Sequence, residues 1–213
     1  MSKKIQPLRL ENSGLEKGDW KILKSLNTPA KIQDFLNKMP FNFEKHGQTH
    51  TSVAITLKRN KSHCFEGALL AAAGLWIQGR KPLLLDLVTI RPDFDHVVAL
   101  FEEDGYWGAI SKTNHAVLRY REPIYKNLRE LVMSYFNEYY LGDGRKTLRK
   151  YSEPFDLSKE GSYWLTTKEN LATLAHKLDR SKHYNILTPK QVRNLRKAER
   201  IEVDASAIIE HKR

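Results

Sequence analysis

The stretch KSHCFEGALLAAAGLWIQG, residues 61–79, predicts the element around which this chain folds. Apolar side chains recur at steps of three and four residues from Leu69 to Ile77, and alanines fill positions between them. Because such a helix is apolar nearly all round, we expect it to be buried at the centre of the fold and to end at Gly79. Cys64, near its start, is the only cysteine of the chain.

The residues after this helix predict an antiparallel sheet. KPLLLDLVTI, residues 81–90, is a short apolar run typical of a buried strand. HVVALF, residues 96–101, and YWGAIS, residues 106–111, are separated by the turn EEDG, in which Gly105 can take a positive φ angle. The two strands are therefore expected to form a hairpin, and the fold class expected is α+β.

Further helices are indicated by their ends. Thr28 and the proline after it predict a helix that ends at Pro40, and the same Thr-Pro pair recurs at Thr188. PIYKNLRELVMSYFNEYYLG, residues 123–142, predicts a long amphipathic helix with proline at its start and glycine at its end. TTKENLATLAHKL predicts a shorter one, capped by one of its two threonines.

We divide the chain into three parts. Residues 1–19 show little periodicity and are expected to form a loosely tied arm. Residues 20–157 would form the core domain, and residues 158–213 a helical extension with a basic tail. Within the core domain, SVAITLKRNK, residues 52–61, is ambiguous between a short strand and an extended approach to the next element.

Composition limits the classes of protein that fit. A chain of 213 residues can bury a sizeable core without disulfides, and its single cysteine cannot form one internally. No apolar run approaches the roughly 20 residues that span a bilayer, so we expect no membrane contact and a cytoplasmic protein. The sequence leaves the oligomeric state open.

The net charge of +11 raises the question of nucleic acid. The basic residues are, however, spread along the whole chain and lack interleaved aromatics for stacking on bases. Their densest cluster is Lys190, Arg193, Arg196, Lys197 and Arg200. We interpret this cluster as the solvated face of a helix rather than a nucleic-acid surface.

Cys64 lies where a helix N-terminus would stabilise a thiolate and offer free N–H groups to an oxyanion. It needs a base within hydrogen-bond reach. His63 is adjacent, but neighbours at a helix start point in different directions, which makes it a poor partner. His96 opens a strand in phase with Val98 and Leu100, and that side of the sheet is expected to face the central helix. His96 is therefore the predicted base.

The residue that orients His96 should lie on the neighbouring strand. Antiparallel pairing across the EEDG turn brings Ser111 close to the start of the first strand, and Asn114 and Asp95 are secondary candidates. A serine would orient the ring while stabilising an imidazolium less than a carboxylate would.

Two other interpretations of these residues remain. A lone cysteine at the edge of an apolar helix is often a buried structural residue. Cys64, His96 and His115 could also supply metal ligands, but the local pairs typical of zinc sites are absent from the sequence. We therefore predict neither a metal nor another cofactor.

The strings SHCFEGALLAAAGLW, PLLLDL, DHVVALF, GYWGAISKTNHAVLRYREPIY and LRELVMSYFNEYY resemble transglutaminase-like proteins, a branch of the papain-like superfamily, and within it a bacterial subgroup of unassigned function. The resemblance covers roughly residues 27–157. It implies a helix headed by Cys64 on an antiparallel sheet, with Cys64 as nucleophile and His96 as base. The usual third residue is Asp, and Ser111 stands in its place.

The function predicted from these residues is thiol-dependent hydrolysis or acyl transfer at an amide bond of a peptide or a glutamine-like side chain. The partner would be a peptide or protein substrate. The alternative is a catalytically weak or inactive binding or scaffold protein on the same fold, in which the basic tail contacts an acidic partner. Thiol reactivity against pH separates the two.

Overall fold

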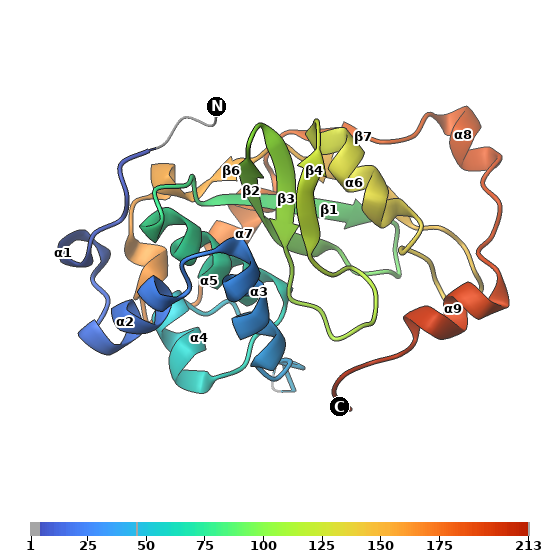
Figure 1. Cartoon of the computed structure of the whole chain (residues 1–213). Coiled ribbons are helices and arrows are strands. Elements are labelled where there is room, and N and C mark those ends of the chain that lie inside the picture. Colours follow the sequence, from blue (N-terminus) through green and yellow to red (C-terminus); the bar gives the residue numbers. More distant parts are fainter. Residues whose placement is uncertain (1–4, 46, 213) are drawn as a thin grey trace.

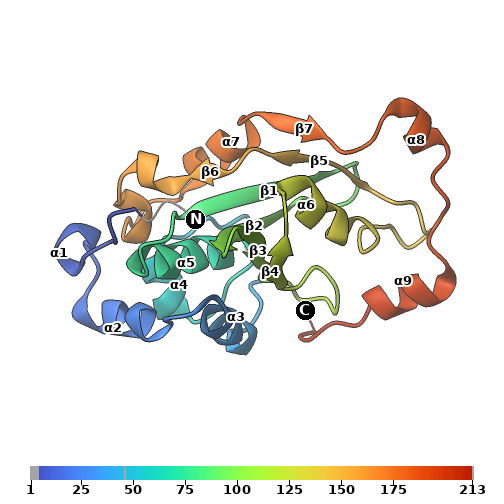
Figure 2. The same ribbon diagram turned by 45° about the horizontal axis from the view of Figure 1, so that its top comes forward.

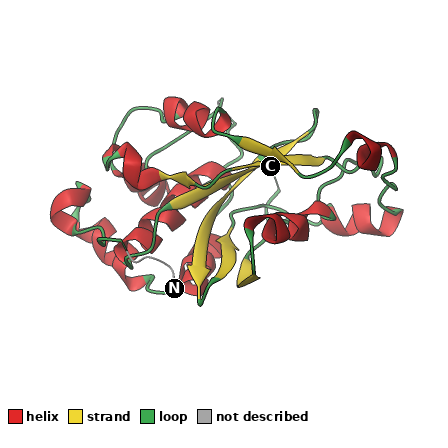
Figure 3. Ribbon diagram, turned by 90° about the horizontal axis from the view of Figure 1, so that it is seen from above, coloured by secondary structure: helices red, strands yellow, loops and turns green. Residues whose placement is uncertain are grey.

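The computed structural model describes residues 5–45 and 47–212. Its centre is a seven-stranded antiparallel sheet in the order β4-β3-β2-β1-β5-β7, with β6 pairing with β1 (Figure 1). The strands are β1 Leu83–Thr89, β2 His96–Glu103, β3 Tyr106–Ile110, β4 Arg121–Tyr125, β5 Leu148–Ser152, β6 Phe155–Asp156 and β7 His183–Asn185. Figure 3 shows these strands between two groups of helices. The fold is thus α+β, and the predicted hairpin is present as β2 and β3.

The central helix α5, Cys64–Ile77, is buried along most of its length and packs on one face of the sheet, where Leu84, Ala99 and Phe101 point. Helices α2 Lys17–Ser25, α3 Pro29–Lys38 and α4 Val53–Arg59 surround it (Figure 2). The start of α5 comes so close to the segment after β3 that a Cβ on Gly67 would lie 2.5 Å from Cβ of Lys112. A glycine is therefore required where the helix approaches the residue after Ser111.

The opposite face of the sheet is covered by helix α6, Leu128–Phe136. Val98 and Leu100 of β2 pack there against Leu131 and Val132. The expectation that Val98 and Leu100 face the central helix is therefore wrong. The side chains do alternate along the strand, but a sheet covered on both faces has two apolar sides, and alternation does not say which helix covers which side.

Two elements differ from the sequence prediction. Residues 52–61 contain helix α4, in which Val53 and Thr56 are buried. The predicted helix over 123–142 begins only at Leu128, because residues 121–125 form β4 at the edge of the sheet. Proline is tolerated in an edge strand, whose outward N–H groups have no ladder partner.

The amino-terminal segment is held against the core rather than loosely tied. It contains the short helix α1, Leu10–Ser13, and Leu8 and Leu15 are buried. The Leu8 N–H donates to the Trp76 carbonyl oxygen at 3.1 Å, so this segment closes over the C-terminal end of α5. Residues 1–4 of the predicted arm lie outside the described residues.

The residues after 157 continue the same core. They comprise 3₁₀ helices η1 Leu157–Glu160 and η2 Tyr163–Leu165, and helices α7 Ala172–Asp179, α8 Pro189–Arg193 and α9 Arg200–Ser206. Trp164, Leu174 and Leu178 are buried in the cluster that contains α5. Thr28 and Thr188 cap α3 and α8 as predicted, whereas α7 begins after Leu171 without a side-chain cap. Across the described residues, no helix combines the length and apolarity needed to cross a membrane.

Candidate active site

Cys64 is the first residue of the fourteen-residue helix α5, and the residue as a whole is half-buried. The peptide dipoles of a helix add along its axis, so the positive end of the α5 dipole lies at Cys64. The helix start therefore favours the ionised form of this thiol.

His96 and Ser111 meet at the start of β2. Nε2 of His96 lies 2.8 Å from Oγ of Ser111, and the Ser111 hydroxyl donates to the Leu118 carbonyl oxygen at 2.5 Å. Since a hydroxyl has one proton, which goes to Leu118, its oxygen accepts from the Nε2–H of His96. In neutral His96 this fixes the tautomer and leaves the Nδ1 lone pair free to take a proton.

Ser111 itself is fixed by a residue that the sequence did not suggest. The Ser111 N–H donates to Oε1 of Gln33 at 2.9 Å, and Nε2 of Gln33 donates to the Ser111 carbonyl oxygen at 2.8 Å. The side-chain amide of Gln33, on α3, thus bonds to the N–H and carbonyl oxygen of Ser111 as the backbone of a neighbouring strand would. The amphipathic pattern of α3 gave no sign of Gln33, because such a pattern identifies apolar positions and does not name a polar contact.

The pKa of Cys64 depends on its burial and on two neighbouring imidazoles. Burial raises the pKa, but hydrogen bonding from His63 and His96, together with their charges, lowers it well below the usual thiol range. The structure thus brings Cys64, His96 and Ser111 together. An ionised thiol beside a fixed imidazole is the arrangement that nucleophilic catalysis by cysteine requires.

His63 lies closer to the thiol than expected. Its Nδ1 is 4.0 Å from Sγ of Cys64 and also accepts from the Phe65 N–H at 3.3 Å, while its Nε2 is 2.6 Å from the Thr49 carbonyl oxygen. The prediction that His63 points away is wrong because His63 is the N-cap of α5, and an N-cap side chain folds back over the first turn.

Two carboxylates lie near the Nε2 atom of His63. Nε2 lies 3.7 Å from Oε2 of Glu66 and 3.6 Å from Oε1 of Glu44. Burial lowers the pKa of His63, but contact with Cys64 and the charge of Glu66 raise it, to about 9. A protonated Nδ1 would give up the cap on Phe65 and aim its proton at the sulfur. We take the ring as cationic when Cys64 is ionised, since the two carboxylates favour that charge.

Glu66 is held by its own hydrogen bonds. Its buried carboxylate accepts from Oγ1 of Thr51 at 2.8 Å, from Oγ1 of Thr49 at 3.0 Å and from Nδ2 of Asn42 at 3.0 Å. It also accepts from the His63 N–H at 3.2 Å, which completes a capping box. The spacing of His63 and Glu66 is the only signal in the sequence that could have indicated this unit.

The two secondary candidates lie elsewhere. The Asn114 side chain pairs with the backbone of His211, through two hydrogen bonds of 2.9 Å. Oδ1 of Asp95 accepts from the N–H and the hydroxyl of Thr89, at 2.7 and 3.1 Å. These hydrogen bonds thus tie neither side chain to the His96 ring. The other metal-ligand candidate, His115, has its Nδ1 3.1 Å from the Ser206 carbonyl oxygen.

Tyr139 is a further group near the thiol that the sequence did not single out. Its hydroxyl is buried and has no hydrogen-bond partner among the described residues. Burial raises the pKa of Tyr139 well above its usual value, and the charge of Cys64 adds to the effect. This buried phenol belongs to the hydrophobic cluster that contains Leu131 and Val132 of α6.

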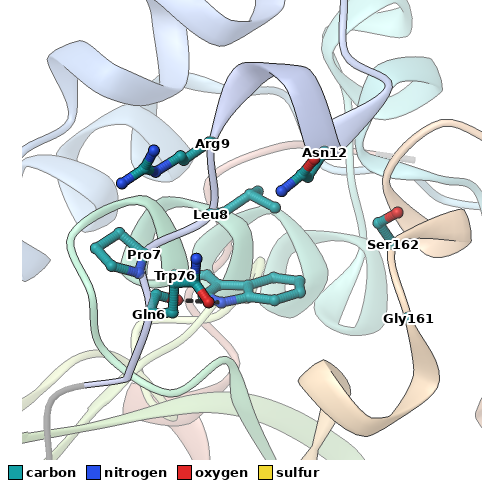
Figure 4. A pocket seen from close by; sticks show the side chains of 8 residues that line it. All are labelled: Gln6, Pro7, Leu8, Arg9, Asn12, Trp76, Gly161 and Ser162. Carbon is teal, nitrogen blue, oxygen red and sulfur yellow. Dashed lines mark hydrogen bonds between the residues drawn. The ribbon is translucent and has the colours of Figure 1, made fainter.

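Two cavities lie apart from the contact of His96 with Ser111. One, of about 260 Å³, is where the amino-terminal segment crosses Trp76 near the far end of α5 (Figure 4). The other, of about 200 Å³, is lined by Asp86, Val88, Asp95, Lys150, Asp179 and His183. There, Nε2 of His183 lies 3.3 Å from Oδ2 of Asp86, and burial, with the charge of Asp95, raises the pKa of Asp86 to about 7.

Comparison with known proteins does not extend this description, since no family model and no curated protein matches the chain.

Proposed function

We propose that this protein is a thiol-dependent enzyme of the transglutaminase-like, papain-like class that acts on an amide bond of a peptide or a glutamine-like side chain. The observation that carries the proposal is the thiol of Cys64 at the start of a buried helix, in contact with imidazoles, one of them fixed by Ser111. The Cys-headed helix packed on an antiparallel sheet supports the choice of class.

The reaction begins with the Cys64 thiolate attacking the carbonyl carbon while His96 carries the proton. The C–S bond forms, the C=O π electrons move to oxygen, and the Cys64 N–H at the helix start receives the oxyanion. His96 then gives its proton to the leaving amine, the C–N bond breaks, and a thioester remains. Water, deprotonated by His96, attacks the thioester and releases the acid and the thiol. An amine in place of water gives acyl transfer.

The proposal is tested by the rate of iodoacetamide alkylation between pH 5 and pH 9. The parent should show reactive thiolate far below the ordinary cysteine pKa of about 8.5. His96→Ala should shift the profile to higher pH, whereas His176→Ala, which removes an exposed histidine of α7, should leave it unchanged. Slow alkylation at the same rate in the parent and in His96→Ala would mean that Cys64 is a structural residue.

A second candidate is a binding or scaffold protein on this fold. The observation in its favour is that a neutral hydroxyl, rather than a carboxylate, orients His96. The exposed basic residues between 190 and 200 would then contact an acidic partner. In that case the thiol profile is ordinary, and binding of an acidic polypeptide survives Cys64→Ala but weakens steeply with salt.

A further inference from the structure

The segment 206–212 lies along the loop that follows Ser111. The Ala116 N–H donates to the Ile208 carbonyl oxygen at 2.9 Å, and the Glu210 N–H donates to the Asn114 carbonyl oxygen at 2.9 Å. His115 and Ile209 form the antiparallel bridge between these bonds. The segment is therefore attached as an added strand, through its backbone.

The loop also supplies side chains to the segment. The Asn114 amide donates to the His211 carbonyl oxygen and accepts from the His211 N–H, each at 2.9 Å. A side-chain amide that makes both of these bonds to one residue recognises the peptide backbone, so the interaction does not depend on the side chain of that residue. Arg119 adds a preference for charge, because its guanidinium lies 2.9 Å from Oε1 of Glu210.

Few apolar contacts hold the segment in place. Ile208 is 62% exposed and Ile209 is 43% exposed, so neither of the two largest apolar side chains of the segment is buried in the core. The segment is held by backbone hydrogen bonds, by the two part-buried bonds to Asn114 and by an ion pair whose side chains are each 32% exposed, with little apolar burial. A segment held in this way belongs to the less stable part of a fold. A peptide that makes the same backbone bonds can therefore take its place.

The register directs the added strand toward Cys64. Ile209 pairs with His115, and Glu210 bonds to Asn114, so each further residue of the segment lies beside one nearer to Ser111. The charge of Glu210 is felt at Lys112, directly after Ser111. A strand continued in this direction approaches His96, which Ser111 contacts.

We propose that residues 113–119 form a binding site for an extended peptide with a glutamate facing Arg119, and that residues 208–211 occupy this site as a tethered ligand. The inference deepens the proposed function by naming the substrate class, and in that part it rests on the proposed function.

The binding test uses the peptide SAIIEHK, residues 206–212, carrying a fluorophore. A chain ended after Ser206 keeps α9, which is anchored by the Tyr140 hydroxyl on the Glu202 carbonyl oxygen at 2.6 Å. This chain should bind the peptide at least ten-fold more tightly than the parent, whose tethered copy competes at an effective concentration on the order of millimolar. Equal or undetectable binding by both chains would overturn the proposal.

A full-length variant guards against misfolding of the shortened chain. In Glu210→Lys the tethered segment loses its ion pair and the new lysine repels Arg119. The free peptide with the parent sequence should therefore bind to this variant at least ten-fold more tightly than it binds to the parent chain. Adding Arg119→Glu should reverse this gain. If Glu210→Lys tightens peptide binding and the added Arg119→Glu does not reverse it, then Arg119 does not bind the glutamate of the peptide.

Asn114→Ala in the shortened chain removes both amide bonds and should weaken peptide binding about thirty-fold. The matched control is Asn194→Ala, which truncates an exposed asparagine after α8. Equal binding by the two variants would overturn the assignment of Asn114.

The substrate part is tested with the thiol. In the shortened chain, SAIIEHK lengthened by four residues at its C-terminal end should slow Cys64 alkylation several-fold at saturation, and the unlengthened peptide should not. An unchanged rate with the longer peptide bound would overturn the substrate part alone. A parent thiol that lacks reactivity at low pH would instead reject the proposed function and leave the peptide site standing.

Discussion

Removing the hydroxyl of Ser111 should make Cys64 a weaker nucleophile near neutral pH. The Ser111 oxygen accepts from Nε2–H of His96 at 2.8 Å, so Ser111→Ala leaves a buried N–H without its acceptor. The charges of His63 and His96 both lower the pKa of Cys64, and a hydrogen bond to a charged group contributes about 1.5–3 kcal/mol. Loss of this bond disfavours the thiolate-imidazolium pair by that amount.

The loss can be expressed on the pH scale. One unit of pKa corresponds to about 1.4 kcal/mol, so the apparent pKa of Cys64 alkylation should rise by roughly one to two units in Ser111→Ala. The assay is the iodoacetamide rate across the pH range, followed by the mass of the alkylated chain. His96 should also sample more orientations, which lowers the plateau rate.

Ser25→Ala is the matched control for this variant. The exposed Ser25 hydroxyl donates to the Ile22 carbonyl oxygen at 2.7 Å, as the Ser111 hydroxyl donates to Leu118, but it contacts no titratable group of the site. Its profile should overlay that of the parent. An unshifted profile in a folded Ser111→Ala chain would refute the argument that Ser111 supports the charge of His96.

Three further predictions rest on single contacts. Cys64→Ala should lower the pKa of His63 from about 9 toward its ordinary value, measured by NMR titration of the ring, because the thiolate is a principal cause of the rise. Gly67→Ala should destabilise the fold by about 1–3 kcal/mol in chemical unfolding, since the new Cβ would lie 2.5 Å from Cβ of Lys112. The free energy of unfolding should fall as pH rises from about 4 to about 7, because Asp86 keeps its proton in the folded state after the unfolded state has lost it.

Each of these predictions has its own control. Gly18→Ala places a methyl group in open space on α2 and should be neutral or slightly stabilising, so equal losses for both alanines would contradict the packing argument. Asp86→Asn should flatten the pH dependence of stability, and a slope that persists would assign it to other groups. A His63 pKa that stays near 9 without the thiol would assign the rise to the charge of Glu66 and the hydrogen bond with the Thr49 carbonyl oxygen.

Elements whose signal is local can be predicted from the sequence. The periodicity of α5 and the Thr-Pro starts of α3 and α8 are each contained in a few adjacent residues. The β2–β3 hairpin follows in the same way from its two runs and its turn. Because the hairpin also fixes an antiparallel register, its sequence predicts that His96 and Ser111 lie close together, and the two side chains do touch.

Local signals are insufficient where elements compete for the same residues. The predicted helix begins at Pro123, but residues 123–125 belong to β4, because the edge beside β3 gives them backbone partners as a strand. Residues 52–61 are ambiguous because seven residues of α4 are too few to establish a period, and the burial of Val53 and Thr56 decides their structure.

The sequence by itself determined a buried helix headed by the single cysteine, an antiparallel hairpin, and a histidine facing a serine across it, because each depends on neighbours along the chain. Only the tertiary structure decided which sheet face α5 covers and how Gln33 fixes Ser111. It also decided that Asn114 bonds to the backbone of His211 rather than to the imidazole of His96. These contacts join residues 78 and 97 positions apart. Contacts at such separations are selected by the packing of whole elements, and no local spacing records them.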